Sequence, residues 1–178
     1  MSLQKSALSP KFYVTLFFVG IGTFLVHEFA HWLTGIAIGH DMVATLNHVW
    51  SRNPMSALDQ SMVSSAGPVI TIAQGIAGFW LAKHHRSQFG FALLYMAFFM
   101  RLLAEGMSFF NPNDEARVSQ LLGLGIWTLP VIVVTGLFGL LVSASRNLKL
   151  RFRDQLFCYL VASVVVTLIV GADAALWR

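Results

Sequence analysis

Five long apolar stretches constrain the fold of this chain more than any other feature of its sequence. A helix needs about 20 mainly apolar residues to cross the roughly 30 Å hydrocarbon core of a bilayer, because it rises 1.5 Å per residue. The stretches that qualify are Phe12 to about Gly39, Met62–Ala82, Phe89–Phe110, Leu121–Ser143 and Leu156–Trp177. Backbone in lipid must satisfy its own hydrogen bonds, so we expect each stretch to be a helix. The sequence therefore predicts an all-α, polytopic membrane bundle of about five transmembrane helices.

The composition also favours a bilayer environment. Only 11% of the 178 residues are charged, whereas a soluble domain carries roughly 25%. This shortage argues against a soluble globule, a disordered chain and a nucleic-acid binder. The single cysteine, Cys158, argues against an internal disulfide or a multi-cysteine zinc site. We expect residues 1–178 to form one multi-pass integral membrane domain, placed in the cell membrane.

The longest connection between the apolar stretches runs over residues 40–61. Within it, the segment Met42–Leu46 could form a short strand near the membrane surface. His48 lies in the same connection and could approach a site at this end of the helices.

The first apolar stretch contains His27-Glu28-Phe29-Ala30-His31, an HExxH motif. Residues i and i+4 share one face of a helix, so both imidazoles can bind one metal ion. Glu28 lies beside them and could take a proton from a water molecule that the metal activates. Ionisable groups are costly inside a membrane helix and usually mark a functional site. We therefore expect one metal ion per chain, with Zn²⁺ as the natural candidate.

Two histidines leave a catalytic zinc site one protein ligand short. The first stretch ends, the second begins and the third ends on the same membrane face, and Asp114 follows the third. Asp114 is therefore the expected third ligand, with Glu115 as its competitor. Asp114 could instead cap the next helix, and the two histidines could instead belong to a polar cluster between helices without metal.

At this point the sequence resembles the site-2-protease-like intramembrane zinc metalloproteases. The order of the motifs is that of the three-helix core of this family. The matching elements are His27-Glu28-x-x-His31 in one span, Ala66-Gly67-Pro68 in the next, and Asn111-Pro112-x-Asp114 at the following span. The sequence departs from the family at two positions. Glu115 stands where a glycine is usual, and Thr71 stands where an asparagine is common.

The resemblance implies a protease-like core at about residues 12–125. It implies a zinc ion held by His27, His31 and Asp114, with Glu28 as general base and acid. The implied reaction is hydrolysis of peptide bonds within or next to transmembrane segments of membrane protein substrates. The family's site is usually reached from the cytosol, whereas the distribution of Lys and Arg places the N-terminus inside and the site toward the outside. The orientation therefore stays open.

Several other polar residues are candidates for lesser roles. Thr71 and Gln74 could contact substrate, although hydrogen bonding between helices is the more common role for such residues. Arg101 and Glu105 are four residues apart in the third stretch, so we expect them to pair on one helical face.

Two other functions are compatible with these residues. The first is a catalytically inactive metal-binding scaffold that binds membrane partners. The second is a membrane di-iron oxidase, because His84-His85 together with the HExxH histidines resembles histidine boxes, although His84-His85 is expected at the opposite membrane face. Control of the protease could come from a membrane regulatory partner or from the accessibility of the substrate. The sequence specifies neither the substrate nor the oligomeric state.

Overall fold

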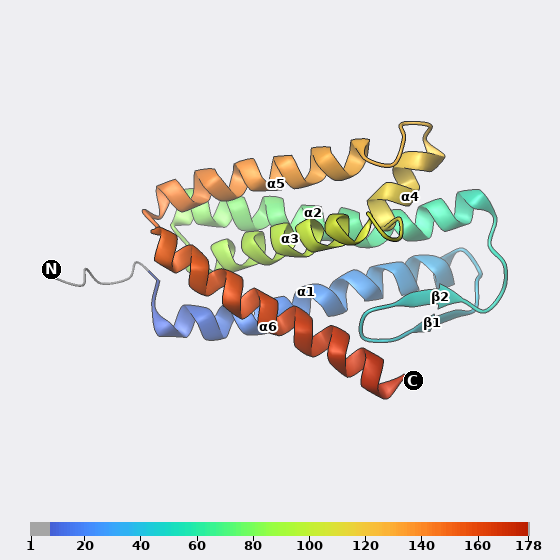
Figure 1. Ribbon diagram of the computed structural model, residues 1–178, viewed down its shortest axis with the longest axis horizontal. Helices are drawn as coiled ribbons and strands as arrows, with labels where there is room; N and C mark the ends of the chain where they lie inside the picture. Colours follow the sequence, from blue (N-terminus) through green and yellow to red (C-terminus); the bar gives the residue numbers. More distant parts are fainter. Residues whose placement is uncertain (1–7, 178) are drawn as a thin grey trace, which may run out of the picture.

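The computed structural model describes residues 8–177, which form six helices and one β-hairpin. Five of the helices are long and apolar enough to cross a membrane, as the sequence predicts, and α4 is the exception. In chain order the elements are α1 (Pro10–Ala37), β1 (Met42–Ala44), β2 (Val49–Ser51), α2 (Ala57–His85), α3 (Gln88–Met107), α4 (Asp114–Leu121), α5 (Thr128–Asn147) and α6 (Phe152–Leu176) (Figure 1). The predicted all-α membrane bundle is therefore confirmed.

Serine caps mark the start of the first three long helices. The Ser9 hydroxyl accepts a hydrogen bond from the backbone N–H of Phe12, and Pro10 occupies the first turn of α1. Ser56 and Ser87 cap α2 and α3 in the same way. Such caps satisfy backbone donors that have no partner within the helix, and proline fits the first turn because its missing N–H is not needed there.

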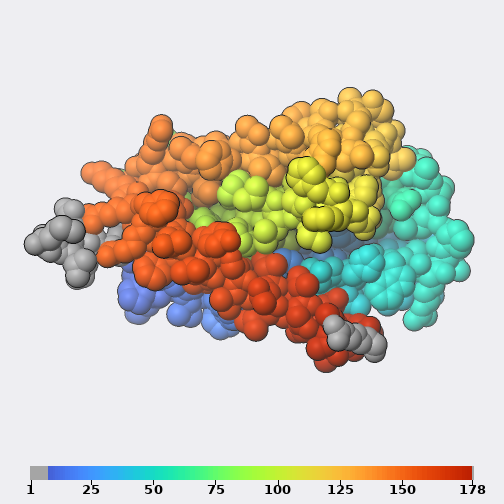
Figure 2. All heavy atoms as spheres, viewed as in Figure 1, coloured from blue at the N-terminus to red at the C-terminus, as the bar shows by residue number. Residues whose placement is uncertain are grey.

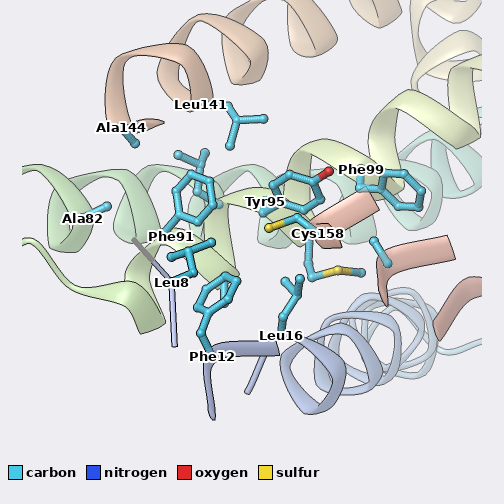
Figure 3. Close-up of a cluster of buried hydrophobic side chains, with 14 of the residues drawn as sticks. Leu8, Phe12, Leu16, Ala82, Phe91, Tyr95, Phe99, Leu141, Ala144 and Cys158 are labelled. Atoms are coloured by element: carbon cyan, nitrogen blue, oxygen red, sulfur yellow. The ribbon is translucent and has the colours of Figure 1, made fainter. Parts of the chain in front are cut away.

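Helix α3 forms the centre of the bundle. It packs against α1, α2 and α5 and touches α6, and it is the most buried of the five long helices. Its aromatic side chains meet side chains of α1, α5 and α6 in one apolar core (Figure 3). The labelled core residues are Leu8, Phe12, Leu16, Ala82, Phe91, Tyr95, Phe99, Leu141, Ala144 and Cys158.

A pair of glycines lets α2 and α3 approach closely. A Cβ atom on Gly78 of α2 would lie 2.6 Å from the carbonyl oxygen of Gly90 in α3. Membrane helices associate through such contacts because small residues let backbones approach.

The outer faces of α5 and α6 carry large apolar side chains, such as Ile132, Phe138 and Leu168, that are more than half exposed. A soluble monomer rarely exposes large contiguous apolar patches. These faces fit a lipid environment, so the chain is a multi-pass membrane protein.

The end of the bundle that holds the hairpin and α4 departs in detail from the sequence prediction. The predicted fourth span, Leu121–Ser143, begins too early, because Gly123 and Gly125 adopt positive φ angles of 71° and 78° and α5 starts only at Thr128. Glycine takes this conformation without steric cost. The predicted strand near Met42 exists and pairs antiparallel with β2, with Val43 opposite Trp50.

Candidate metal centre

Two histidines from α1 form the base of the site. His27 and His31 are only 4% and 5% exposed, and they lie one helical turn apart against α2. Their Nε2 atoms are 3.1 Å apart. At this distance the two nitrogens either share a hydrogen bond or both direct a lone pair at a common partner, and the tautomers of the two rings decide between these cases.

Asp114 approaches the histidine pair from the first turn of α4. Its Oδ2 atom lies 3.4 Å from Nε2 of His27 and 3.3 Å from Nε2 of His31. The three residues could therefore hold a metal ion. A tetrahedral ion with bonds of about 2.0–2.1 Å places its ligand atoms about 3.3 Å apart. The observed spacings of 3.1–3.4 Å fit such an ion.

The hydrogen bonds behind the two imidazoles turn both Nε2 atoms toward this centre. Nδ1 of His31 lies 2.6 Å from the carbonyl oxygen of Val63, which can only accept, so Nδ1 donates. Nδ1 of His27 lies 3.0 Å from Oγ1 of Thr71, whose own proton goes to the carbonyl oxygen of Gly67. Both Nε2 atoms therefore keep a lone pair for a metal, the arrangement that metal-binding histidines usually show.

Gly67 of α2 has no side chain, so the imidazoles of His27 and His31 pack directly against the backbone of this helix. A Cβ atom there would lie 2.5 Å from Cε1 and 2.7 Å from Nε2 of His27, and would also collide with His31. Only glycine fits this position without moving the rings. The small residue in Ala66-Gly67-Pro68 thus has a steric role in the site.

Arg101 of α3 pairs with Glu115 of α4. Its Nη1 atom donates to both carboxylate oxygens of Glu115, at 2.9 and 3.1 Å, and both side chains are buried. The expected pairing of Arg101 with Glu105 is wrong, because α4 brings a carboxylate to Arg101 from outside its own helix. Neither oxygen of Glu105 has a hydrogen-bond partner among the described residues. Of the two candidate third ligands, Asp114 faces the histidines and Glu115 faces Arg101.

A cavity of about 1110 Å³ opens beside the three candidate ligands. Glu28 is partly exposed and lines it, so its carboxylate shares this space with His27, His31 and Asp114. Other walls come from the hairpin, α3 and α6, which Figure 2 shows meeting on one face of the molecule. Among the lining residues are Phe24, His48, Trp50, Val63, Met100, Arg117, Thr167 and Val170.

The two weak candidates for substrate contact do not line this cavity. Thr71 instead orients His27. The Gln74 amide donates to the Thr23 hydroxyl and to the carbonyl of Leu93, at 2.9 and 3.0 Å, and so joins α2 to α1 and α3.

The residues of α6 and Arg117 line the cavity but are not among the site residues predicted from the sequence. Thr167 and Val170 lie in an apolar run that carries no functional signal, and only the fold brings that run to the site. Arg117 follows Asp114 by three residues, a helical spacing that would have pointed to it once α4 was known.

The second histidine pair lies far from the metal centre. His84 and His85 contact Trp80 at the end of α2, and His85 lies 18 positions after Gly67 in this helix, or about 27 Å along it. One site cannot use both pairs, so this geometry disfavours a di-iron oxidase.

No protein-family model, curated protein or solved structure matches this chain. The residues of the metal centre and of the cavity beside it are therefore what indicates a function.

Proposed function

We propose that this protein is an intramembrane zinc metalloprotease of the cell membrane, which hydrolyses peptide bonds within or next to transmembrane segments of membrane protein substrates. One observation carries the proposal: Glu28 shares a cavity with a His27–His31–Asp114 cluster inside a bundle of membrane helices. The resemblance of the three motifs to site-2-protease-like enzymes supports the same reaction.

Zinc suits this cluster because two imidazole nitrogens and one carboxylate oxygen are ligands that it commonly takes. Three protein ligands leave a fourth position open, which distinguishes catalytic from structural zinc sites. When bound, zinc supplies a Lewis acid that polarises a carbonyl group and lowers the pKa of water to about 7.

In this proposal Glu28 is the residue that moves the proton. It directly follows His27 in the chain, yet its side chain lines the cavity rather than the cluster of ligand atoms. As a general base it accepts a proton from the attacking water, and as a general acid it delivers that proton to the leaving amine.

The cavity sets conditions on the substrate. Its walls include Phe24, Val63, Met100 and Val170, which suit the apolar side chains of a membrane segment. A helical substrate must unwind locally before hydrolysis, because its carbonyl groups are engaged in hydrogen bonds. A membrane regulatory partner would control how a substrate reaches this space.

The test is the Glu28→Gln variant of the full chain, reconstituted in liposomes with a panel of transmembrane peptides. Because Glu28 is not a ligand, the variant should keep one zinc per chain by elemental analysis and lose cleavage by mass spectrometry. Wild-type protein treated with a chelator, and then resupplied with zinc, is the control for metal dependence. Cleavage by Glu28→Gln at the wild-type rate would contradict the proposed role of Glu28. Zinc in the wild type without cleavage of any peptide would favour the metal-binding scaffold.

A further inference from the structure

The ion pair between Arg101 and Glu115 lies beside the metal centre but outside its ligands. We propose that this pair positions Asp114, so that metal affinity depends on two residues that do not touch the metal. The inference rests on the metal centre of the proposed function and needs no proteolysis.

Helix α4 cannot fix the place of Asp114 by itself. It has only eight residues, and isolated helices shorter than about 12 residues are marginal in water. Its N-cap residue, Asn113, makes no side-chain capping bond. The position of α4, and hence of Asp114 in its first turn, is therefore set by contacts with the rest of the bundle.

Arg101 supplies the strongest of these contacts from α3. The Arg101 and Glu115 side chains are 2% and 4% exposed, and one guanidinium nitrogen bonds both carboxylate oxygens. Within residues 8–177 this is the only ion pair that joins α4 to α3. Hydrogen bonds between charged groups are roughly twice as strong as neutral ones, and burial strengthens them further.

The geometry of α4 couples this pair to Asp114. Neighbouring residues of a helix point about 100° apart, so Asp114 and Glu115 can engage different helices of the bundle. Asp114 faces the histidines of α1, and Glu115 faces Arg101 of α3. A shift of α4 that released Glu115 would also move the Asp114 carboxylate away from the histidines.

The same guanidinium reaches the other side of the metal centre. Nη2 of Arg101 lies 3.5 Å from both ring nitrogens of His27. Arg101 thus contacts a candidate ligand from α1 and the residue next to a candidate ligand from α4. Arg101 therefore links α1 and α4 at the metal centre.

Glu105 provides a matched control on the same helix as Arg101. It is 7% exposed, and neither of its oxygens has a hydrogen-bond partner among the described residues. Glu105→Gln breaks no ion pair or hydrogen bond among the described residues, although Glu105 lies within electrostatic range of Arg101 and Glu115. Glu105→Gln and Glu115→Gln are the same chemical change at two buried sites, and only the second breaks the ion pair.

The experiment measures the zinc affinity of the full chain in detergent by competition with a chelator of known affinity. Glu115→Gln should bind zinc about 10–100-fold more weakly than wild type, the usual cost of losing a residue that orients a ligand. Arg101→Lys keeps the charge but loses the planar geometry, and should weaken binding in the same direction. Glu105→Gln should stay within about twofold of wild type.

A double variant separates positioning from a general loss of charge. If both residues act through their pair, Arg101→Gln combined with Glu115→Gln should bind zinc no more weakly than the weaker single variant. Thermal unfolding and size-exclusion profiles confirm that each variant is folded. Should Glu115→Gln not fold, the comparison of Arg101→Lys with Glu105→Gln decides the question.

The possible failures are distinguishable. A wild-type chain that binds no zinc would overturn the metal centre, and with it both the proposed function and this inference. A wild type that binds zinc together with a folded Glu115→Gln of unchanged affinity would overturn this inference alone. Equal weakening by Glu105→Gln and Glu115→Gln would also overturn it, because the effect would not then depend on the ion pair.

Discussion

The hydroxyl of Thr71 accepts a hydrogen bond from Nδ1 of His27 across 3.0 Å and donates its own proton to the carbonyl of Gly67. This pair joins α2 to α1 at the metal centre. Because the hydroxyl proton is already donated to Gly67, Nδ1 of His27 must carry the proton between these two residues. Nε2 is then free to bind a metal, so Thr71 decides which tautomer His27 adopts.

The Thr71→Val variant should therefore bind zinc about 10–100-fold more weakly than wild type. Valine has nearly the shape of threonine but offers no acceptor, so the Nδ1 proton loses its partner and the ring is no longer oriented. Thr71→Ser keeps the hydroxyl and should stay close to wild type. Competition with a chelator measures both, and equal affinities for the two variants would contradict the orienting role.

The Gly67→Ala variant should disturb the same site by steric means. The added methyl group would collide with both imidazoles, and overpacking of this kind typically costs about 1–3 kcal/mol. We expect a lower unfolding temperature and loss of zinc by elemental analysis. Gly22→Ala in α1 is the matched control, since a Cβ atom there meets nothing within 4 Å. A Gly67→Ala protein with full zinc content would show that the rings can move aside.

The five apolar helices could be predicted from the sequence because each is long enough to fill the hydrocarbon core, a constraint that depends on no other part of the chain. The pairing of His27 with His31 could be predicted for a similar reason, since helical spacing alone puts them on one face. Asp114 could be predicted as the third ligand only by working out which helix ends share a membrane face. The structure does bring it to the histidines.

The partner of Arg101 could not be predicted in this way. Helical spacing favours Glu105, whereas the structure uses Glu115, because α4 folds back and its first turn reaches α3. The lining by α6 was hidden for the same reason. The Arg101–Glu115 pair and the lining of the cavity by α6 both depend on how the helices pack. The apolar sequence around Val170 does not indicate which helix or cavity it will face.

The side chain of Asp173, near the end of α6, holds the turn of the hairpin through a hydrogen bond. Oδ1 of Asp173 accepts a hydrogen bond from the backbone N–H of Leu46 at 2.8 Å. Asp173→Ala should speed hydrogen exchange at Leu46 by about 10–150-fold, because a hydrogen bond to a carboxylate contributes about 1.5–3 kcal/mol. Asp173→Asn keeps an oxygen that can accept, so it should exchange more slowly than Asp173→Ala. Mass spectrometry of the 45–48 turn measures this, and unchanged exchange in Asp173→Ala would show that the turn is held by other contacts.

Acidification should release the metal through the histidines rather than through Asp114. Burial by itself raises the pKa of Asp114, but its close contacts with His27 and His31 outweigh burial and hold the pKa well below its usual range. The carboxylate therefore stays ionised throughout the mildly acidic range. A protonated Nε2 has no lone pair for a metal, so protons compete with the metal for both imidazoles. Metal affinity therefore falls as the pH falls, by up to about 100-fold per pH unit once both rings must lose a proton to bind. Competition with a chelator between pH 8 and pH 5 measures the loss of zinc affinity, and recovery on return to pH 8 distinguishes it from unfolding. A zinc affinity unchanged over this range would contradict release through the two imidazoles.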